Sequence, residues 1–221
     1  LPLGGFAGRT AAVTIDAKLY VVRACSIVTD AELATMSRDA MFNFTQVEVV
    51  DPVEGTVSLL PLTNMTDDMA RANATCLQFN SPSTNPAIFI IGGVRLRDGK
   101  LTDSIAMVIL DPSLPRFADR VARLPKPVMG LGGFSTTSAM YVVGGFLDRQ
   151  GTPSLHHYTI LTSADITNLP LCIFESATLP IGSLPSLRNP WNDMQMVGFA
   201  GRQLILTRDA LLSMWDLGIS E

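Results

Sequence analysis

The stretch Ala87-Ile88-Phe89-Ile90-Ile91-Gly92-Gly93 is an apolar run that ends in a pair of glycines. It recurs downstream as Ala139-Met140-Tyr141-Val142-Val143-Gly144-Gly145. A short β-rich run closed by Gly-Gly predicts a buried strand that enters a tight turn, because glycine tolerates positive φ and lets backbones approach closely. Two copies about 50 residues apart predict a repeat, and periods near that length are typical of propeller blades. We therefore assign the four glycines to equivalent bends: Gly92, Gly93, Gly144 and Gly145.

The residues around the two runs also repeat. A polar loop and a second apolar run follow each glycine pair: Arg95–Lys100 then Ser104–Leu110, and Leu147–Thr152 then Ser154–Leu161. Near the chain start, Lys18–Val22 is a third such run, with Arg23-Ala24 in place of the glycines. Alternation of apolar runs with polar turns indicates an antiparallel sheet in each unit.

The first unit contains an insertion, Ser26–Asn43, between two predicted strands. Its Thr29–Met41 portion has good helix formers behind Asp30, a candidate N-cap, so we expect a helix of one or two turns. Asp51-Pro52 and Asp111-Pro112 each follow a predicted strand and favour a turn there.

The repeat divides the chain into four units of about four strands, of which the last is one strand short. We place them at residues 1–61, 62–125, 126–180 and 181–221. The other expected strands are Ala11–Ile15, Thr45–Val50, Thr56–Leu60, Ala74–Phe79, Phe117–Leu124, Leu169–Phe174, Met194–Phe199, Gln203–Thr207 and Leu211–Leu217.

Composition excludes several classes of protein. The chain is 47% hydrophobic and 16% charged, which indicates a folded domain rather than a disordered one. No apolar run is long enough to cross a bilayer, so we expect no transmembrane segment. The net charge is −4 and Lys and Arg form no cluster, which argues against nucleic-acid binding.

Three cysteines, Cys25, Cys76 and Cys172, lie far apart, and no pair has the spacing of a metal site or a CxxC motif. Two interpretations stay open: three half-buried thiols, or one disulfide with one thiol left over if the chain is secreted. The chain begins at Leu1-Pro2 with no initiator Met, so we expect a processed product or a segment of a larger protein.

Three N-x-[ST] sequons lie in the first third of the chain, at Asn43, Asn64 and Asn73. All three fall in predicted loops or at strand ends, where a glycan is tolerated. They are suggestive of glycosylation, and two locations stay open: a secreted or cell-surface protein, or a cytoplasmic one.

Residue types that carry chemistry are sparse. His156-His157 are adjacent, so on a strand they point to opposite faces and are poorly placed to share one metal. Gly130-Leu131-Gly132-Gly133 lacks the third glycine of a dinucleotide loop, and we interpret these glycines as turn residues. We find no Ser/His/Asp or paired-carboxylate arrangement, and we assign no catalytic residue, metal ligand or cofactor.

The repeated units resemble kelch repeats, in which a strand ends in Gly-Gly and a later strand ends in an aromatic residue. Gly92-Gly93, Gly144-Gly145 and the strand-end Tyr158 carry the resemblance, while Val50 and Leu110 stand where the other units would have the aromatic. The resemblance implies an all-β fold of about four propeller blades of antiparallel strands, forming part of a larger propeller. The rival architecture is a β-sandwich.

The resemblance also bears on function. Some kelch-like propellers are copper oxidases with a Tyr–Cys cross-link and His and Tyr ligands. The tyrosines here, Tyr20, Tyr141 and Tyr158, fall at expected core positions and match no such ligand set.

We therefore expect a non-enzymatic interaction or structural module. Its contact loops would be Ser26–Phe42, Arg95–Lys100 and Asp148–Pro153, and its partner another protein or the remaining blades. The alternative is a carbohydrate-active or copper-oxidase-like propeller enzyme whose site lies partly outside this chain.

Overall fold

A computed structural model gives the fold of the chain. It describes residues 11–25, 28, 30–66, 69–79, 85–135, 139–143, 145–150, 152, 154, 157–161, 172–176, 194–199, 202–207 and 212–216. Some residues of interest in the sequence lie outside this part of the chain: Gly144, His156 and the side chains of Cys25, Tyr141, His157, Tyr158 and Cys172.

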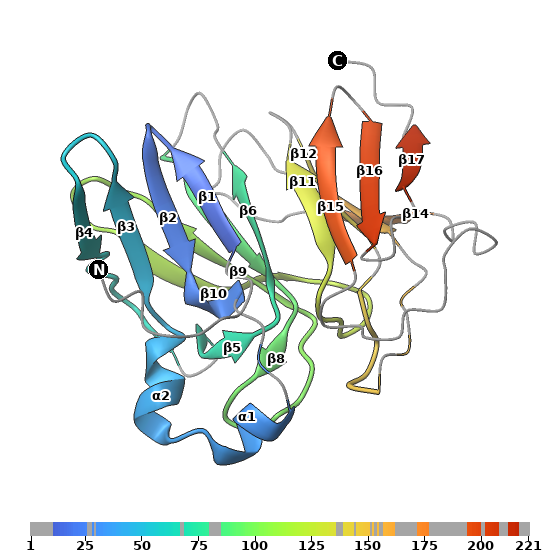
Figure 1. Ribbon diagram of the computed structural model, residues 1–221, viewed down its shortest axis with the longest axis horizontal. Helices are drawn as coiled ribbons and strands as arrows, with labels where there is room; N and C mark the ends of the chain where they lie inside the picture. Colours follow the sequence, from blue (N-terminus) through green and yellow to red (C-terminus); the bar gives the residue numbers. More distant parts are fainter. Residues whose placement is uncertain are drawn as a thin grey trace.

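The protein is all-β, with strands arranged in successive antiparallel sheets (Figure 1). The first sheet has the order β1-β2-β3-β4, the second β10-β9-β7-β6, the third β11-β12-β13-β14 and the fourth β15-β16-β17. Strands that are close in sequence therefore pair with one another, as the alternation of apolar runs and turns predicts.

The strands of the first two sheets are β1 (Ala11–Ile15), β2 (Lys18–Val22), β3 (Val47–Asp51), β4 (Thr56–Leu59), β6 (Thr75–Phe79), β7 (Ala87–Ile91), β9 (Ser104–Ile109) and β10 (Arg116–Arg123). Those of the last two are β11 (Gly132–Ser135), β12 (Ala139–Val143), β13 (His157–Leu161), β14 (Cys172–Ser176), β15 (Met194–Phe199), β16 (Arg202–Thr207) and β17 (Leu212–Asp216). Two short strands, β5 (Arg71–Ala72) and β8 (Val94–Arg95), pair with each other.

Most expected strands are confirmed within two residues, but the turn expected at Gly132-Gly133 is wrong. Gly132 and Gly133 are not turn residues: they lie in β11 and pair with Val143 and Val142 of β12. Of the three glycines in that stretch, only Gly130 has a positive φ, of 63°. The expected strand Leu169–Phe174 overlaps β14, and its first three residues lie outside the described part of the chain. A glycine in a strand gives no side-chain pattern from which the sequence could locate it.

The second sheet is packed on both faces. In strand β7 of this sheet, Phe89 and Ile91 face the third sheet and pack with Val128, Met140 and Val142. The intervening residues of β7 face the first sheet, in a second core cluster that includes Ile88, Ile90, Val13, Ile15, Val22 and Val47. All five β7 residues are buried, which explains why this strand is an unbroken apolar run rather than an alternating one.

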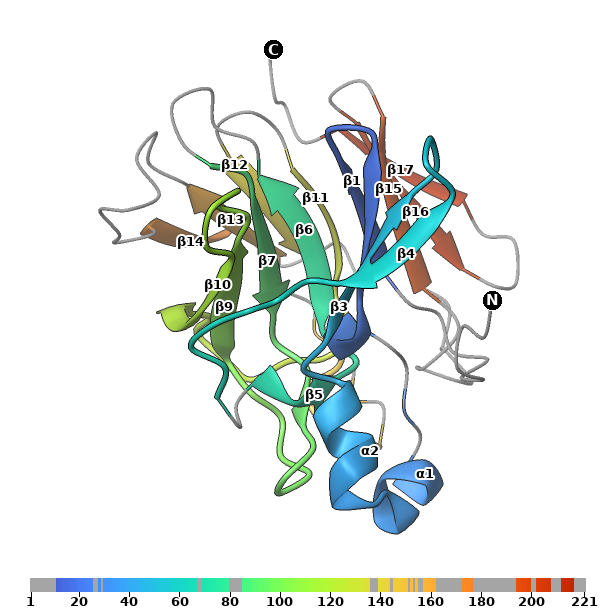
Figure 2. The same cartoon turned by 90° about the vertical axis from the view of Figure 1, so that its left-hand side faces the viewer.

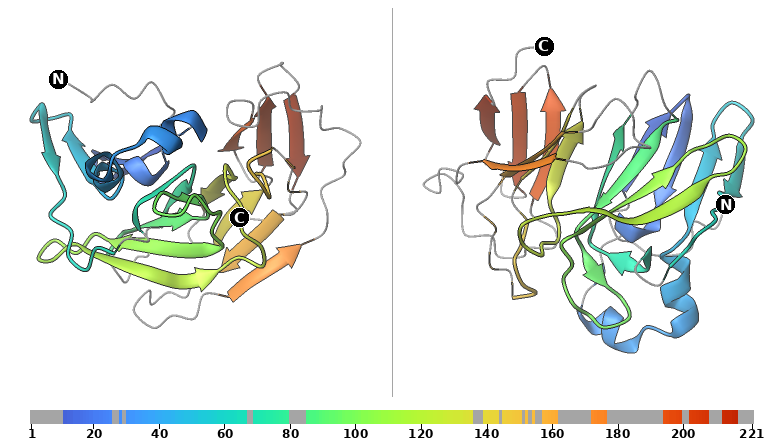
Figure 3. Two further views of the ribbon diagram at one scale, coloured as in Figure 1. Left: turned by 90° about the horizontal axis from the view of Figure 1, so that it is seen from below. Right: turned by 180° about the vertical axis from the view of Figure 1, so that it is seen from behind.

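The sheets follow one another in an arc when the molecule is seen from below (Figure 3, left). The first strand of each sheet contacts the first strand of the next: β1 lies against β6, β6 against β11, and β11 against β15. In the described residues the arc is not closed by pairing, because no ladder joins the fourth sheet to the first.

The insertion in the first sheet forms two short helices, α1 (Asp30–Thr35) and α2 (Arg38–Asn43), at the end of the sheets that also carries β5 and β8 (Figures 1 and 2). The expected helix is thus confirmed but divided. Ser37 begins the second helix, where its hydroxyl accepts the amide N–H of Ala40 at 3.1 Å.

Cys76 on β6 is disulfide-bonded, so the interpretation with three free thiols is wrong. Among the described helices, none combines the length and apolar character that a membrane span requires.

Candidate functional site

The described glycines that follow β7 and β12 are closely surrounded by backbone atoms. Gly93, with φ 97°, has no room for a side chain: a Cβ there would stand 2.7 Å from the carbonyl oxygen of Ala72. At Gly145, with φ 76°, a Cβ would stand 2.6 Å from the carbonyl oxygen of Met129. Both positions need glycine because of backbone conformation and space together.

Hydrogen bonds give Gly93 and Gly145 matching partners. The carbonyl of Gly93 accepts the N–H of Thr102 at 2.9 Å, and that of Gly145 accepts the N–H of Ser154 at 2.8 Å. Their obstructing neighbours match too, since Ala72 pairs with Val94 and Met129 bridges to Phe146. The second and third sheets therefore use one local design for the bend that follows their second strand.

Aspartates shape a second pair of matching turns, between the third and fourth strands of the first two sheets. Asp51 Oδ1 accepts the N–H groups of Val53 and Glu54, both at 3.0 Å. Asp111 Oδ1 accepts the Ser113 hydroxyl at 2.6 Å and the Ser113 N–H at 2.8 Å.

These hydrogen bonds act on the charge of the two carboxyl groups. The N–H of Glu54 holds the pKa of Asp51 below its ordinary value, and the Ser113 hydroxyl does the same for the pKa of Asp111.

The three loops expected to make contacts converge at the end of the molecule that carries the helices. A Cβ at Gly99 would be 3.2 Å from a guanidinium nitrogen of Arg149 and 3.6 Å from a methyl carbon of Leu33. Gly99 follows β8, Leu33 belongs to α1, and Arg149 belongs to the loop of the third sheet. Loops that are about 50 residues apart in sequence are thereby brought together by the repeat.

Asn73 ties the insertion to the second sheet. Its Oδ1 accepts the N–H of Val28 at 2.9 Å, and its Nδ2 donates to the carbonyl of the same residue at 3.1 Å. Asn73 has a positive φ, of 56°. Its carbonyl accepts the N–H of Gly130 at 2.8 Å, and Gly130 also has a positive φ, of 63°. Asparagine tolerates this left-handed conformation better than other residues with a side chain.

Arg71, which is 1% exposed, stabilises the bend after β7 by hydrogen bonds. Its guanidinium donates to the carbonyls of Gly92, at 3.3 Å, and Ser104, at 3.1 Å. These bonds span the two ends of the loop between β7 and β9, so Arg71 fixes the base from which that loop projects.

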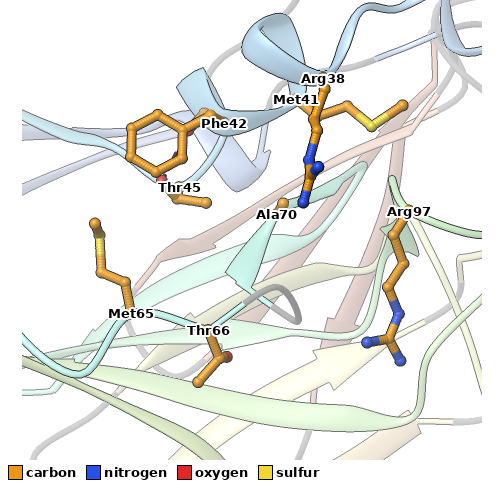
Figure 4. A pocket seen from close by; sticks show the side chains of 8 residues that line it. All are labelled: Arg38, Met41, Phe42, Thr45, Met65, Thr66, Ala70 and Arg97. Carbon is orange, nitrogen blue, oxygen red and sulfur yellow. Dashed lines mark hydrogen bonds between the residues drawn. The ribbon is translucent and has the colours of Figure 1, made fainter.

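A pocket of about 380 Å³ lies beside α2, between the insertion and the loop after β8 (Figure 4). The side chains that line it are Arg38, Met41, Phe42, Thr45, Met65, Thr66, Ala70 and Arg97. In Figure 4, Phe42 and Met65 lie on one side of the space and the two arginines on the other. The lining therefore combines an apolar wall with a cationic one.

Exposure and charge make this pocket a candidate binding site. Phe42 is 54% exposed and Met65 is 42% exposed, and both line the same pocket, so they form a shared exposed apolar surface. In the described part of the chain, Arg38 makes no ion pair or hydrogen bond, whereas Arg97 does have a partner. Asp67 and Asp68 stand in the sequence between lining residues Thr66 and Ala70 but lie outside the described residues.

The three sequons are placed very differently. Asn43, at the end of α2, and Asn64, with φ 58°, are exposed. Asn73 is 4% exposed and occupied by its bonds to Val28.

In the described residues, no cluster of three or more His, Cys, Asp or Glu side chains could hold a metal ion. Tyr20 is half-buried, and burial raises the pKa of its hydroxyl. It lies on the inner face of the first sheet, among apolar neighbours rather than beside potential ligands.

The sequence did not reveal the pocket or the role of Arg71. Met65 and Ala70 lie between two expected strands, Thr56–Leu60 and Ala74–Phe79, and only the fold brings them beside α2. A weak signal was present, since an apolar Met inside a sequon loop and an Arg before β6 both depart from the local pattern.

Comparison with known proteins adds no family: no family model matches this chain, and no curated protein matches it.

Proposed function

We propose that this chain is a binding module built on a kelch-like β-propeller segment, with its contact surface at the convergent loops. The observation that carries the proposal is that three loops from equivalent points of three sheets meet at one end, where Gly99, Leu33 and Arg149 lie together. Loops held by a rigid repeated scaffold are a common way to present a binding surface.

Several features support the propeller architecture. Sheets formed from consecutive strands pack face to face, and their first strands adjoin one another, as strands nearest a propeller axis do. The matching environments of Gly93 and Gly145 are what a structural repeat requires. A β-sandwich instead encloses one core between two sheets, whereas here the second sheet has a core on each face.

The proposal extends to a larger ring, completed by other blades of the same protein or by another chain. The face of the first sheet that points away from the second carries Leu19, Val21, Val57 and Leu59, of which Val57 is 39% exposed and Leu59 54% exposed. An apolar sheet face favours a neighbour. Native mass spectrometry of the purified protein tests this extension, which predicts a species larger than the 23.8-kDa chain; a stable monomer contradicts it.

The pocket beside α2 indicates the chemistry of the partner. A partner segment with a carboxylate next to a bulky apolar side chain would place its charge at Arg38 and its apolar group against Phe42 and Met65. The N–H groups of an arginine guanidinium can bind both oxygens of a carboxylate at once. The pocket volume of about 380 Å³ is enough for one or two side chains rather than a folded surface.

Selection from a displayed library of short random peptides tests this function. The purified chain should enrich peptides that carry Asp or Glu beside Phe, Leu or Met. Arg38→Glu should abolish that enrichment, because it replaces the cation with a like charge. Arg38 is the first residue of α2, where a carboxylate is favourable, so the variant should fold.

Arg116→Glu is the matched control, since it makes the same charge change at an exposed position on β10. It should select the same peptides as the unchanged chain. Equal selection by all three proteins, or no selection by the unchanged chain, would refute the assignment of this pocket as the binding site.

No observation on the described residues favours the enzymatic alternative over the binding module. It remains distinguishable by experiment, because stoichiometric copper in the purified protein or turnover of a sugar would require an active site.

A further inference from the structure

The folded chain separates its three sequons into two that leave room for a glycan and one that does not. Asn64 lies in the connection between the first and second sheets, and both it and Thr66 are exposed. In the described part of the chain its side-chain amide makes no hydrogen bond. A glycan attached there displaces no packed group.

Asn43 is equally accessible. It is the last residue of α2 and is exposed, although the other two residues of its sequon are buried, Phe44 at 3% and Thr45 at 4% exposure. The Thr45 hydroxyl donates to the carbonyl of Phe42 at 2.7 Å. The buried residues anchor the end of the helix and leave the Asn43 amide in solvent.

Asn73 is closed to a glycan in the folded state. Its Nδ2, the atom that would bear the sugar, donates to the carbonyl of Val28, and its Oδ1 accepts the N–H of that residue. A glycan on Nδ2 would break this pair and displace the insertion from the second sheet.

The disulfide at Cys76 is the independent observation about compartment. Disulfides form and persist in oxidising compartments, which are also where sequons are glycosylated. We propose that the protein is N-glycosylated at Asn43 and Asn64, and not at Asn73, during passage through such a compartment.

In this modification the Asn Nδ2 bonds to the anomeric carbon of a lipid-linked oligosaccharide diphosphate, the amide loses one proton, and the lipid diphosphate leaves. The transfer precedes folding. A chain modified at Asn73 would have to fit a glycan at a position that is 4% exposed in the fold, so it would not reach the native state.

The two glycans would border the pocket beside α2. Phe42 is the neighbour of Asn43 in sequence, Met65 is the neighbour of Asn64, and both side chains line the pocket. Bulky glycans on both sides would admit an extended segment more easily than a broad protein surface. This consequence rests on the proposed function, whereas the glycosylation itself does not.

The test is to secrete the full chain from a eukaryotic cell and measure its intact mass before and after treatment with a peptide N-glycosidase. The enzyme converts each glycosylated Asn to Asp, so peptide mapping then identifies the sites. Asn43→Gln removes one acceptor, and Thr66→Ala removes the Asn64 sequon while keeping Asn64 at its positive φ.

The unchanged chain should carry two glycans, each single variant one, and the double variant none. Asn73→Gln should leave the number of glycans unchanged but lower the thermal midpoint, because it loses the bonds to Val28. A glycan on Asn73 in folded secreted protein, or an unmodified Asn43 or Asn64, would overturn the proposal. Peptide selection measures the pocket and not glycan occupancy, so the two proposals can fail separately.

Discussion

Replacement of Gly92 by alanine measures how closely the second and third sheets approach. Gly92 has φ 63°, and a Cβ there would stand 2.3 Å from the carbonyl oxygen of Val128. That oxygen is fixed, because it also accepts the N–H of Gly93 at 2.8 Å. Backbone on one side or the other must move to admit the methyl group.

Gly55 provides a matched control. Its φ of 65° is nearly the same, but a Cβ there meets nothing within 4 Å. Both substitutions incur the left-handed cost of about 1 to 2 kcal/mol. Their effects on the unfolded chain are also alike, so the difference between the two variants isolates the contact with Val128.

The contact should cost a further 1 to 3 kcal/mol or so, the usual range for overpacking at a site that relaxes in part. At roughly 2 to 4 °C per kcal/mol for a chain of this size, Gly92→Ala should melt about 2 to 12 °C below Gly55→Ala. Differential scanning calorimetry of the two variants measures this gap. Equal melting temperatures would refute the close approach of the two sheets at this bend.

Three more changes have expected outcomes. Asn73→Gly keeps the left-handed backbone but loses both bonds to Val28, and should lower the free energy of unfolding in urea by about 1 to 3 kcal/mol. The carboxyl groups of Asp51 and Asp111 have a lower pKa in the folded chain than in the unfolded one. Their contribution to the stability of the fold is therefore present above the unfolded pKa, about 3.9, and is lost as the pH falls through the folded values. The double variant Asp51→Asn, Asp111→Asn should show a smaller drop in thermal midpoint on acidification than the unchanged chain. Reduction of the disulfide at Cys76 should lower the unfolding free energy by about 2 to 4 kcal/mol, which a thermal scan with and without reductant would detect, and an unchanged scan would contradict.

The strand pattern could be predicted because apolar runs and turn residues are local signals. The run Ala87–Ile91 and the turn opener Asp51 were recognisable from the residues alone, and the structure has a strand and a turn there. Gly132 and Gly133 were misread as a turn because a strand glycine is distinguished only by its pairing partner.

The candidate site was predictable only in part. The loops that would carry it follow from the repeat, since equivalent loops of stacked units come to the same end. The pocket did not follow, because Phe42 and Met65 are more than twenty residues apart and no local pattern shows that they face one space. The burial of Asn73 was equally hidden, since its sequon looks like the other two and only the bonds to Val28 set it apart.

The most direct test of the central claim, that successive sheets are equivalent units, is a solution NMR measurement of the contacts of Gly93 and Gly145. One Hα proton of each glycine stands where a Cβ would be, so Gly93 should show a nuclear Overhauser effect to the amide of Ala74, and Gly145 to the amide of Leu131. Both effects together are the predicted result. Contacts of Gly145 with residues of any unrelated segment, in place of Leu131, would contradict the account.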